Sequence, residues 1–267
     1  MNEQSEKLSE KRINLSFDEV DAKIIYHLYQ DFKVNTLLVS FQEKRRVLST
    51  LDGYEEAFYV ANTYTPPTLA EYMMQNLSEF KRNLPLALGI DPRKIRFLIT
   101  AVDMDNLAVC ERSYEEFKVF CLATAGAKDN AMRAGVDVTR YVERDGNVTA
   151  VGTINLIILT NANLSQGAMA RAIITATEAK TAALQDLDVK STYSPQYQAT
   201  GTGTDNMIVV SGKMGKPLQI SSGHTKMSEL IAFATNIAVT EALKKHDKIE
   251  ARVWTKKSIG AGKIGKK

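Results

Sequence analysis

The chain has 267 residues, of which 44% are hydrophobic and 24% charged, so it is long enough to bury a sizeable core and too apolar to be disordered. Its net charge of +3 comes from residues 255–267, because removing the five lysines there leaves −2 for the remainder. The body therefore has no electrostatic footprint for nucleic acid. It has no apolar run long enough for a membrane span and no leader with an apolar core, so we expect a cytoplasmic protein.

Both ends of the chain differ from the middle in composition. Residues 1–14 are polar and residues 255–267 are basic and rich in glycine, so we expect two flexible segments around a single domain at 15–254. Cys110 and Cys121 stand in apolar surroundings without C-x-x-C spacing. They are predicted to be core thiols rather than a disulfide or a zinc site.

The first half of the chain alternates short apolar runs with polar segments. A mixed pattern at 17–28 suggests a short helix, and Pro66–Pro67 opens a second helix over 68–80. Strands are predicted at 35–40, 95–102, 107–110 and 117–124.

The second half has the clearest pattern. Residues 153–160 are apolar at nearly every position, as in a buried strand, and helices follow at 165–187, with Ser165 as its N-cap, and at 225–245. The order strand, helix, strand from 153 to 210 favours an α/β class. We expect a mixed β-sheet core flanked by helices in a single domain, with layered sheets between helices as a variant.

One stretch, 191–229, concentrates small polar residues and glycine around two apolar runs. The runs at 207–210 and 218–220, with 212–217 between them, predict a strand, a turn and a returning strand. Such a hairpin would bring 199–206 close to 221–225. The sequence thus predicts a pocket built from backbone and small polar side chains.

His224 is one of three histidines and precedes the last predicted helix. The positive end of a helix dipole disfavours imidazolium, so this side chain is expected to be neutral and able to accept a proton. That state suits general acid–base catalysis. The alternative is a histidine that only caps or packs at the start of a helix.

Asp205 and Asn206 follow the glycine-rich GTGT run, in which Gly201 and Gly203 permit close backbone approach to a ligand. Asp205 could orient a base and Asn206 could donate to an oxyanion. An Asx-turn before a strand is the competing interpretation.

Two further segments contain candidate polar side chains. Asn130 and Arg133 follow the strand that ends near Thr124, and Arg133 could hold a carbonyl or carboxylate. Glu178 lies in mid-helix between small residues and could face a site. A polar loop and a solvated helix face are the alternatives.

Three long motifs together resemble the adenosylcobinamide amidohydrolase family. They are TAGAKDNAMRAGVD at 124–137, the stretch from GTINLIILT through GTGTDNMIVVSG at 152–212, and SGHTKMSELIA at 222–232. Ser222 stands where the family is expected to have glycine. The resemblance implies hydrolysis of the amide that joins a corrin propionyl side chain to aminopropanol, giving adenosylcobyric acid for coenzyme B12 salvage.

The resemblance marks the motif positions, and the chemistry of the residues there suggests a role for each. His224, Asp205 and Asn206 would be catalytic, as base, orienting group and oxyanion donor. Substrate contacts would come from Asn130, Arg133, Glu178, Thr202, Gly203, Thr204, Ser221 and Gly223. The only partner implied is the small corrinoid, which carries its own cobalt, so we expect no further cofactor and no metal site in the protein.

Several alternatives stay open at this point. A covalent threonine or serine nucleophile and a directly activated water are both compatible with the residues. A corrinoid-binding protein without catalysis would use the same polar loops. Phosphoryl transfer is suggested only by GTGT and by Gly212–Lys213, and the chain lacks the P-loop pattern. A homo-oligomer is compatible with all of these.

Overall fold

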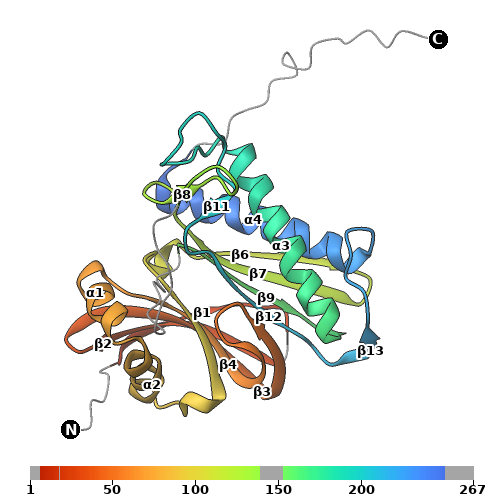
Figure 1. Ribbon diagram of the computed structural model, residues 1–267. Coiled ribbons are helices and arrows are strands. Elements are labelled where there is room, and N and C mark those ends of the chain that lie inside the picture. The colour runs from red at the N-terminus through yellow and green to blue at the C-terminus, as the bar shows by residue number, and fades with distance from the viewer. Residues whose placement is uncertain (1–6, 18, 139–152, 250–267) are drawn as a thin grey trace.

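The computed structural model describes residues 7–17, 19–138 and 153–249 (Figure 1). A nine-stranded mixed sheet forms the framework, with strand order β1-β2-β3-β12-β9-β7-β6 and with β4 and β5 continuing from the other edge of β3. Its strands are β1 (Lys7–Ile13), β2 (Val20–Tyr29), β3 (Phe32–Ser49), β4 (Gly53–Tyr64), β5 (Ile95–Thr100), β6 (Ala108–Tyr114), β7 (Phe117–Ala125), β9 (Ile154–Thr160) and β12 (Asn206–Val210).

Four α-helices and two small ladders complete the described fold. The helices are α1 (Pro67–Gln75), α2 (Leu77–Ala87), α3 (Gln166–Asp186) and α4 (Lys226–Asp247), and 3-10 turns occupy Pro92–Lys94 and Met104–Asn106. In the ladders, β8 (Ala131–Met132) pairs with β11 (Gly201–Thr202), and β10 (Ala162–Leu164) pairs with β13 (Met214–Leu218).

The long strand β3 joins the two halves of the sheet. It pairs antiparallel with β2 over most of its length, and its last residues pair with β12, where Ser49 lies opposite Ile208. The turn from β2 to β3 has two residues, Gln30 and Asp31, both with positive φ. Such a turn matches the twist of a tight antiparallel hairpin.

The sheet curls so that its two halves pack face to face. Side chains alternate along β7, with Val119 and Cys121 facing α3 and α4 and with Phe120 and Leu122 facing the N-terminal half. A third cluster lies between the outer face of that half and helices α1 and α2. The two halves of the sheet therefore form the inner layers, with α3 and α4 outside one half and α1 and α2 outside the other (Figure 1). This confirms the expected α/β class with a mixed sheet, in its layered variant.

Helices α3 and α4 cover the same face of the β6-β7-β9-β12 half (Figure 1). The chain leaves the carboxyl end of β9 before α3 and the carboxyl end of β12 before α4. Both helices then run back toward the amino ends of those strands. Ser165 caps α3 by accepting a hydrogen bond from the backbone N–H of Ala168, as predicted. Alanines line the buried stripe of α3, which lets the helix approach the sheet closely.

Three local expectations were wrong. Residues 17–28 were expected to be helical, but Val20–Tyr29 forms a strand whose apolar residues are buried on both faces. Residues 1–14 were expected to be flexible, but Lys7–Ile13 pairs with β2 as an edge strand. Residues 1–6 and the basic segment 255–267 lie outside the described residues.

The third correction concerns the hairpin predicted between 207–210 and 218–220. The chain does not turn back on β12, because β13 instead pairs in parallel with β10. Gly212 allows this path, since a Cβ placed there would lie 1.9 Å from the carbonyl oxygen of Asn161. The segment after β12 is thus fixed against the segment after β9.

Cys110 and Cys121 face each other in the β6–β7 pairing, and both are free and buried. Burial raises the pKa of the Cys121 thiol to about 12, which makes it a poor nucleophile. The prediction of core thiols is confirmed. Among the described residues, no helix combines the length and the apolar content that crossing a bilayer requires.

Candidate functional site

Polar side chains from four separate segments converge at the amino ends of β9 and β12. Because these strands are parallel and Asn206 lies opposite Asn155, the residues that precede each strand meet at one edge of the sheet. We call this group the edge cluster; it consists of Asn130, Thr153, Lys180, Thr202, Thr204 and Asp205.

Hydroxyl groups connect the cluster. The hydroxyls of Thr153 and Thr204 are 2.9 Å apart, and the side-chain amide of Asn130 donates to Thr153 Oγ1 at 2.6 Å. Thr202 Oγ1 donates to Asp205 Oδ1 at 2.5 Å and contacts Thr153 Oγ1 at 3.4 Å. The three threonines therefore form one continuous network that ends on a carboxylate.

Lys180 lies on α3 and forms an ion pair with Asp205. Its side chain is 6% exposed and that of Asp205 is 14% exposed, so both charges are largely removed from water. The backbone N–H of Thr202 donates to both carboxylate oxygens, at 3.1 and 3.2 Å. Burying such a pair seldom stabilises a fold beyond what apolar residues would achieve, so its presence favours a functional explanation.

Gly201 makes room for this pair. A Cβ atom at Gly201 would lie 2.4 Å from Asp205 Oδ2 and 2.6 Å from Lys180 Nζ, closer than any real contact. Any larger residue here would have to displace the two charged groups. This gives Gly201 a more specific role than the general flexibility expected from the GTGT run.

A second row of amides lies beneath the cluster. Asn206 accepts a hydrogen bond from Thr50 Oγ1 at 3.1 Å and donates to the carbonyl of Thr204 at 3.1 Å. Asn155 donates to Asn62 Oδ1 at 2.9 Å, and Asn62 donates to Thr124 at the same distance. Asn206 thus holds the loop of the edge cluster in place, whereas the sequence suggested an oxyanion donor.

His224 lies at the other end of the sheet. It is exposed and precedes Thr225, which caps α4, and Met227 in the first turn contacts Thr160 at the carboxyl end of β9. Asn236, further along α4, reaches the carbonyl of Ala179 beside Lys180. The nine residues of α4 between Met227 and Asn236 span about 14 Å. Within one chain, His224 therefore does not meet Asp205 or Asn206, and the predicted triad is not assembled.

The other predicted residues divide between the two ends. Ser221 and Gly223 lie beside His224, with Ser221 buried and its hydroxyl without a hydrogen-bond partner among the described residues. Arg133 donates to the carbonyl of Gln198 at 3.4 Å, and Glu178 is exposed on α3. Asn130, Thr202, Gly203 and Thr204 belong to the cluster end.

The sequence analysis missed two members of the edge cluster, Thr153 and Lys180. Of the two, Lys180 left a signal in the sequence. It occupies a position of the buried α3 stripe, four residues after Ala176 and three before Ala183, where an apolar residue is expected. A lysine at such a position must find a partner inside the protein. That conflict between residue type and position was the available signal.

The comparisons with known proteins identify the family of the chain. The family model for adenosylcobinamide amidohydrolase matches residues 21–251. The chain belongs to the adenosylcobinamide amidohydrolase family. The match includes both the edge cluster and His224, so either end of the sheet lies within the part shared with the family.

Two relatives of this chain were found among known proteins. One, from Methanocaldococcus jannaschii and named only as uncharacterized, is 44% identical over 229 residues, which cover 82% of this chain and 89% of the relative. The other, named adenosylcobinamide amidohydrolase, is from Methanosarcina mazei and is 32% identical over 151 residues, covering 56% of this chain and 58% of the relative.

Among solved structures, the PH0078 protein from Pyrococcus horikoshii OT3 aligns over 80% of this chain and 78% of its own. The TM-score is 0.38 and the sequence identity 13%. A likeness at this level carries no argument about fold or function.

Proposed function

We propose that this protein hydrolyses the amide bond between the corrin propionyl side chain and aminopropanol in adenosylcobinamide. The products are adenosylcobyric acid and the free amino alcohol, which serve cobalamin salvage in the cytoplasm. Membership of the family supports the reaction. We place the reaction at the edge cluster, because three threonine hydroxyls meet a Lys–Asp pair there that is largely hidden from water.

The chemistry of amide hydrolysis suits this group of side chains. The reaction needs a nucleophile, a group that takes its proton and a group that returns a proton to the leaving nitrogen. Thr202 donates to Asp205, which is held in turn by Lys180, and this follows the pattern of a nucleophile, a base and an orienting group. The corrinoid carries the cobalt, so no step assigns a metal to the protein.

The proposed sequence has two halves. Thr202 Oγ1 attacks the amide carbonyl carbon while its proton passes to the Asp205–Lys180 pair, and the C–N bond then breaks as that proton moves to the leaving amine. Water next attacks the threonyl ester, restores Thr202 and releases the carboxylate. Asn130 lies within reach of the same hydroxyl network and could donate to the oxyanion.

The direct test is to incubate the purified protein with adenosylcobinamide and measure free aminopropanol and the new corrin carboxylate, without nucleotide. We expect stoichiometric release of both. Lys180→Met and Thr202→Val should abolish release, while Lys216→Met, an exposed lysine on β13, should match the parent. Corrinoid binding with unchanged substrate would reject hydrolysis and favour a non-catalytic binding protein.

The covalent step has its own test. Rapid quenching during turnover should trap a corrinoid ester on the peptide that contains Thr202, and Thr202→Val should lack it. Turnover by Thr202→Val at the parent rate would assign the attack to water instead.

A further inference from the structure

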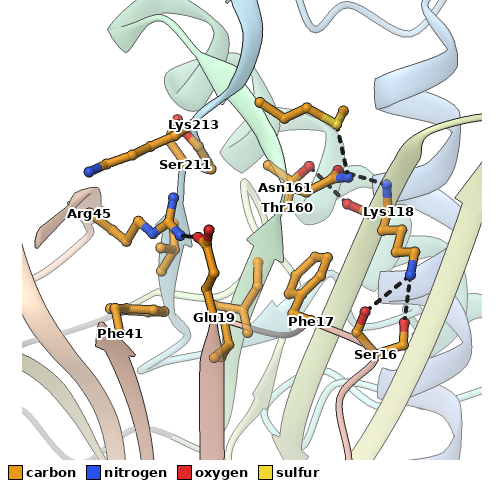
Figure 2. A pocket seen from close by; sticks show the side chains of 15 residues that line it. Ser16, Phe17, Glu19, Phe41, Arg45, Lys118, Thr160, Asn161, Ser211 and Lys213 are labelled. Atoms are coloured by element: carbon orange, nitrogen blue, oxygen red, sulfur yellow. Dashed lines mark hydrogen bonds and ion pairs between the residues drawn. The ribbon is translucent and has the colours of Figure 1, made fainter. Parts of the chain in front are cut away.

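A cavity of about 430 Å³ lies at the carboxyl ends of β9 and β12 (Figure 2). The edge cluster lies at the opposite, amino ends of these strands. The cavity is placed at the carboxyl ends because its lining includes Thr160, the last residue of β9, and Ser211, which follows β12. Ligands of α/β proteins commonly bind at this end of parallel strands. The volume falls within the range of small-molecule pockets.

Arg45 is the most unusual residue of the lining. A break in the β3–β4 register between Ser40 and Arg45 precedes it, and it then shares the buried face of β3 with Phe41 and Val47. Arg45 is 6% exposed, so its charge is held where the pattern calls for an apolar side chain. A buried cation is costly unless it has a strong partner.

The partner that Arg45 has is easily displaced. Its guanidinium pairs through Nη2 with Glu19, and among the described residues this is its one hydrogen bond. The Glu19 side chain is 58% exposed, so this carboxylate can turn into solvent at little cost. The remaining guanidinium donors are then available to a bidentate anion.

Two lysines add positive charge to the same cavity. Figure 2 shows Arg45 and Lys213 on one side of Phe17 and Lys118 on the other. Lys213 pairs with Glu43, an exposed residue that does not line the cavity, and Lys118 donates to Ser16. Glu19 is the one acidic side chain among the described lining residues, against three cations. Walls of this charge concentrate anions.

The rest of the lining is apolar or already engaged. Asn161 donates to the carbonyl of Glu116, and the hydroxyl of Ser211 donates to the carbonyl of Gly212. Apolar contact is offered by Phe17, Val20, Phe41, Leu159, Val210 and Met214. A ligand would therefore be recognised by its negative charge at one end and by an apolar body at the other.

We propose that this cavity is a binding site for a small organic anion, a carboxylate or a phosphate monoester with an apolar body, anchored on Arg45. The ligand displaces Glu19 from the guanidinium and seats its apolar part against Phe17 and Phe41. The site is separate from the edge cluster and does not depend on the proposed hydrolysis.

Calorimetric titration with two probes, benzoate and phenyl phosphate, tests the proposal, with benzamide as the neutral control. We expect at least one anion to bind and benzamide not to bind. Arg45→Met and Lys213→Met should each weaken the anion about tenfold or more, as the loss of a charge-assisted hydrogen bond requires. The two probes distinguish a carboxylate site from a phosphate site.

The exposed lysines Lys44 and Lys216 lie near in sequence but outside the lining, so Lys44→Met and Lys216→Met are matched controls. Absence of binding by both anions, equal binding of benzamide, or equal weakening in the control variants would overturn the proposal. Should Arg45→Met fail to fold, Lys213→Met decides the outcome. Binding is measured without the corrinoid, so failure of the hydrolysis assay has no bearing on it.

Discussion

The ammonium group of Lys180 on α3 and the carboxylate of Asp205 in the loop before β12 form an ion pair that is largely hidden from water. The pair fixes the loop that carries Thr202 and Thr204 against the helix. Because Asp205 also accepts the Thr202 backbone N–H and hydroxyl, one carboxylate holds both Lys180 and Thr202.

Replacing one member of this ion pair should lower the free energy of unfolding more than replacing both. Lys180→Met leaves a buried carboxylate and should lower the free energy of unfolding by about 3 kcal/mol or more. Lys180→Met combined with Asp205→Leu should recover part of that loss while remaining inactive. Urea unfolding of the parent, the single variants and the double variant measures this. A double variant as unstable as the sum of the single changes would contradict it.

Gly201→Ala should lower activity by displacing the Lys180–Asp205 pair. The added methyl group needs the space held by Asp205 Oδ2 and Lys180 Nζ, so both side-chain ends must move. We expect turnover to fall at least tenfold, because a positioned proton-transfer group contributes ~10²–10⁴-fold. Gly167→Ala is the control, since its nearest neighbour is a hydroxyl 4.0 Å away. Equal turnover in the two variants would show that the pair does not matter for activity.

His224 and Asp205 should act independently if each chain works alone. Groups this far apart contribute additively, so the fold-losses of His224→Ala and Asp205→Asn should multiply in the double variant. Members of one catalytic unit behave differently, because the second loss adds little to the first. Steady-state turnover of the four proteins distinguishes the cases. If the double variant turned over as fast as the less active of the two single variants, both residues would belong to one catalytic unit.

His27 should make the protein less stable in acid. Its side chain is fully buried against Thr36, and desolvation lowers its pKa from 6.5 to about 4. Between these values the unfolded chain binds a proton that the folded chain does not, so stability falls as the pH drops from 6.5 toward 4.

From pH 7 to pH 5 the contribution of His27 is about 2 kcal/mol. His27→Gln should lose less stability over this interval than the parent, by that amount, in urea unfolding at both pH values. A parallel pH dependence in His27→Gln would rule out His27 as the source.

The parts of the fold that could be predicted were those with a strong local pattern. The apolar run that became β9 and the stripes of α3 and α4 are decided by periodicity within one element. The Val20–Tyr29 segment was misassigned because apolar residues on both faces of a strand obscure its alternation. Its burial depends on the second half of the sheet, which local sequence does not reveal.

The candidate site was predicted in part for the same reason. Asn130, Thr202 and Thr204 follow or precede strands, and strand ends meet at a common edge. The separation of His224 from Asp205 could not be predicted, because it depends on the pairing of β13 with β10 rather than with its neighbour β12. The local sequence of a strand does not show which distant strand it will pair with.

The junction of β3 with β12 has a consequence for how the chain is made. Ser49 and its neighbours pair with β4 soon after they are synthesised, but the edge of β3 that will face Ile208 has no partner while the ribosome completes the intervening chain. Such an open edge invites pairing with other nascent chains. Closure of the sheet must also await contacts of high sequence separation, which slows folding. Expression at low temperature or with chaperones should therefore raise the yield of monodisperse protein more than stabilising either half alone.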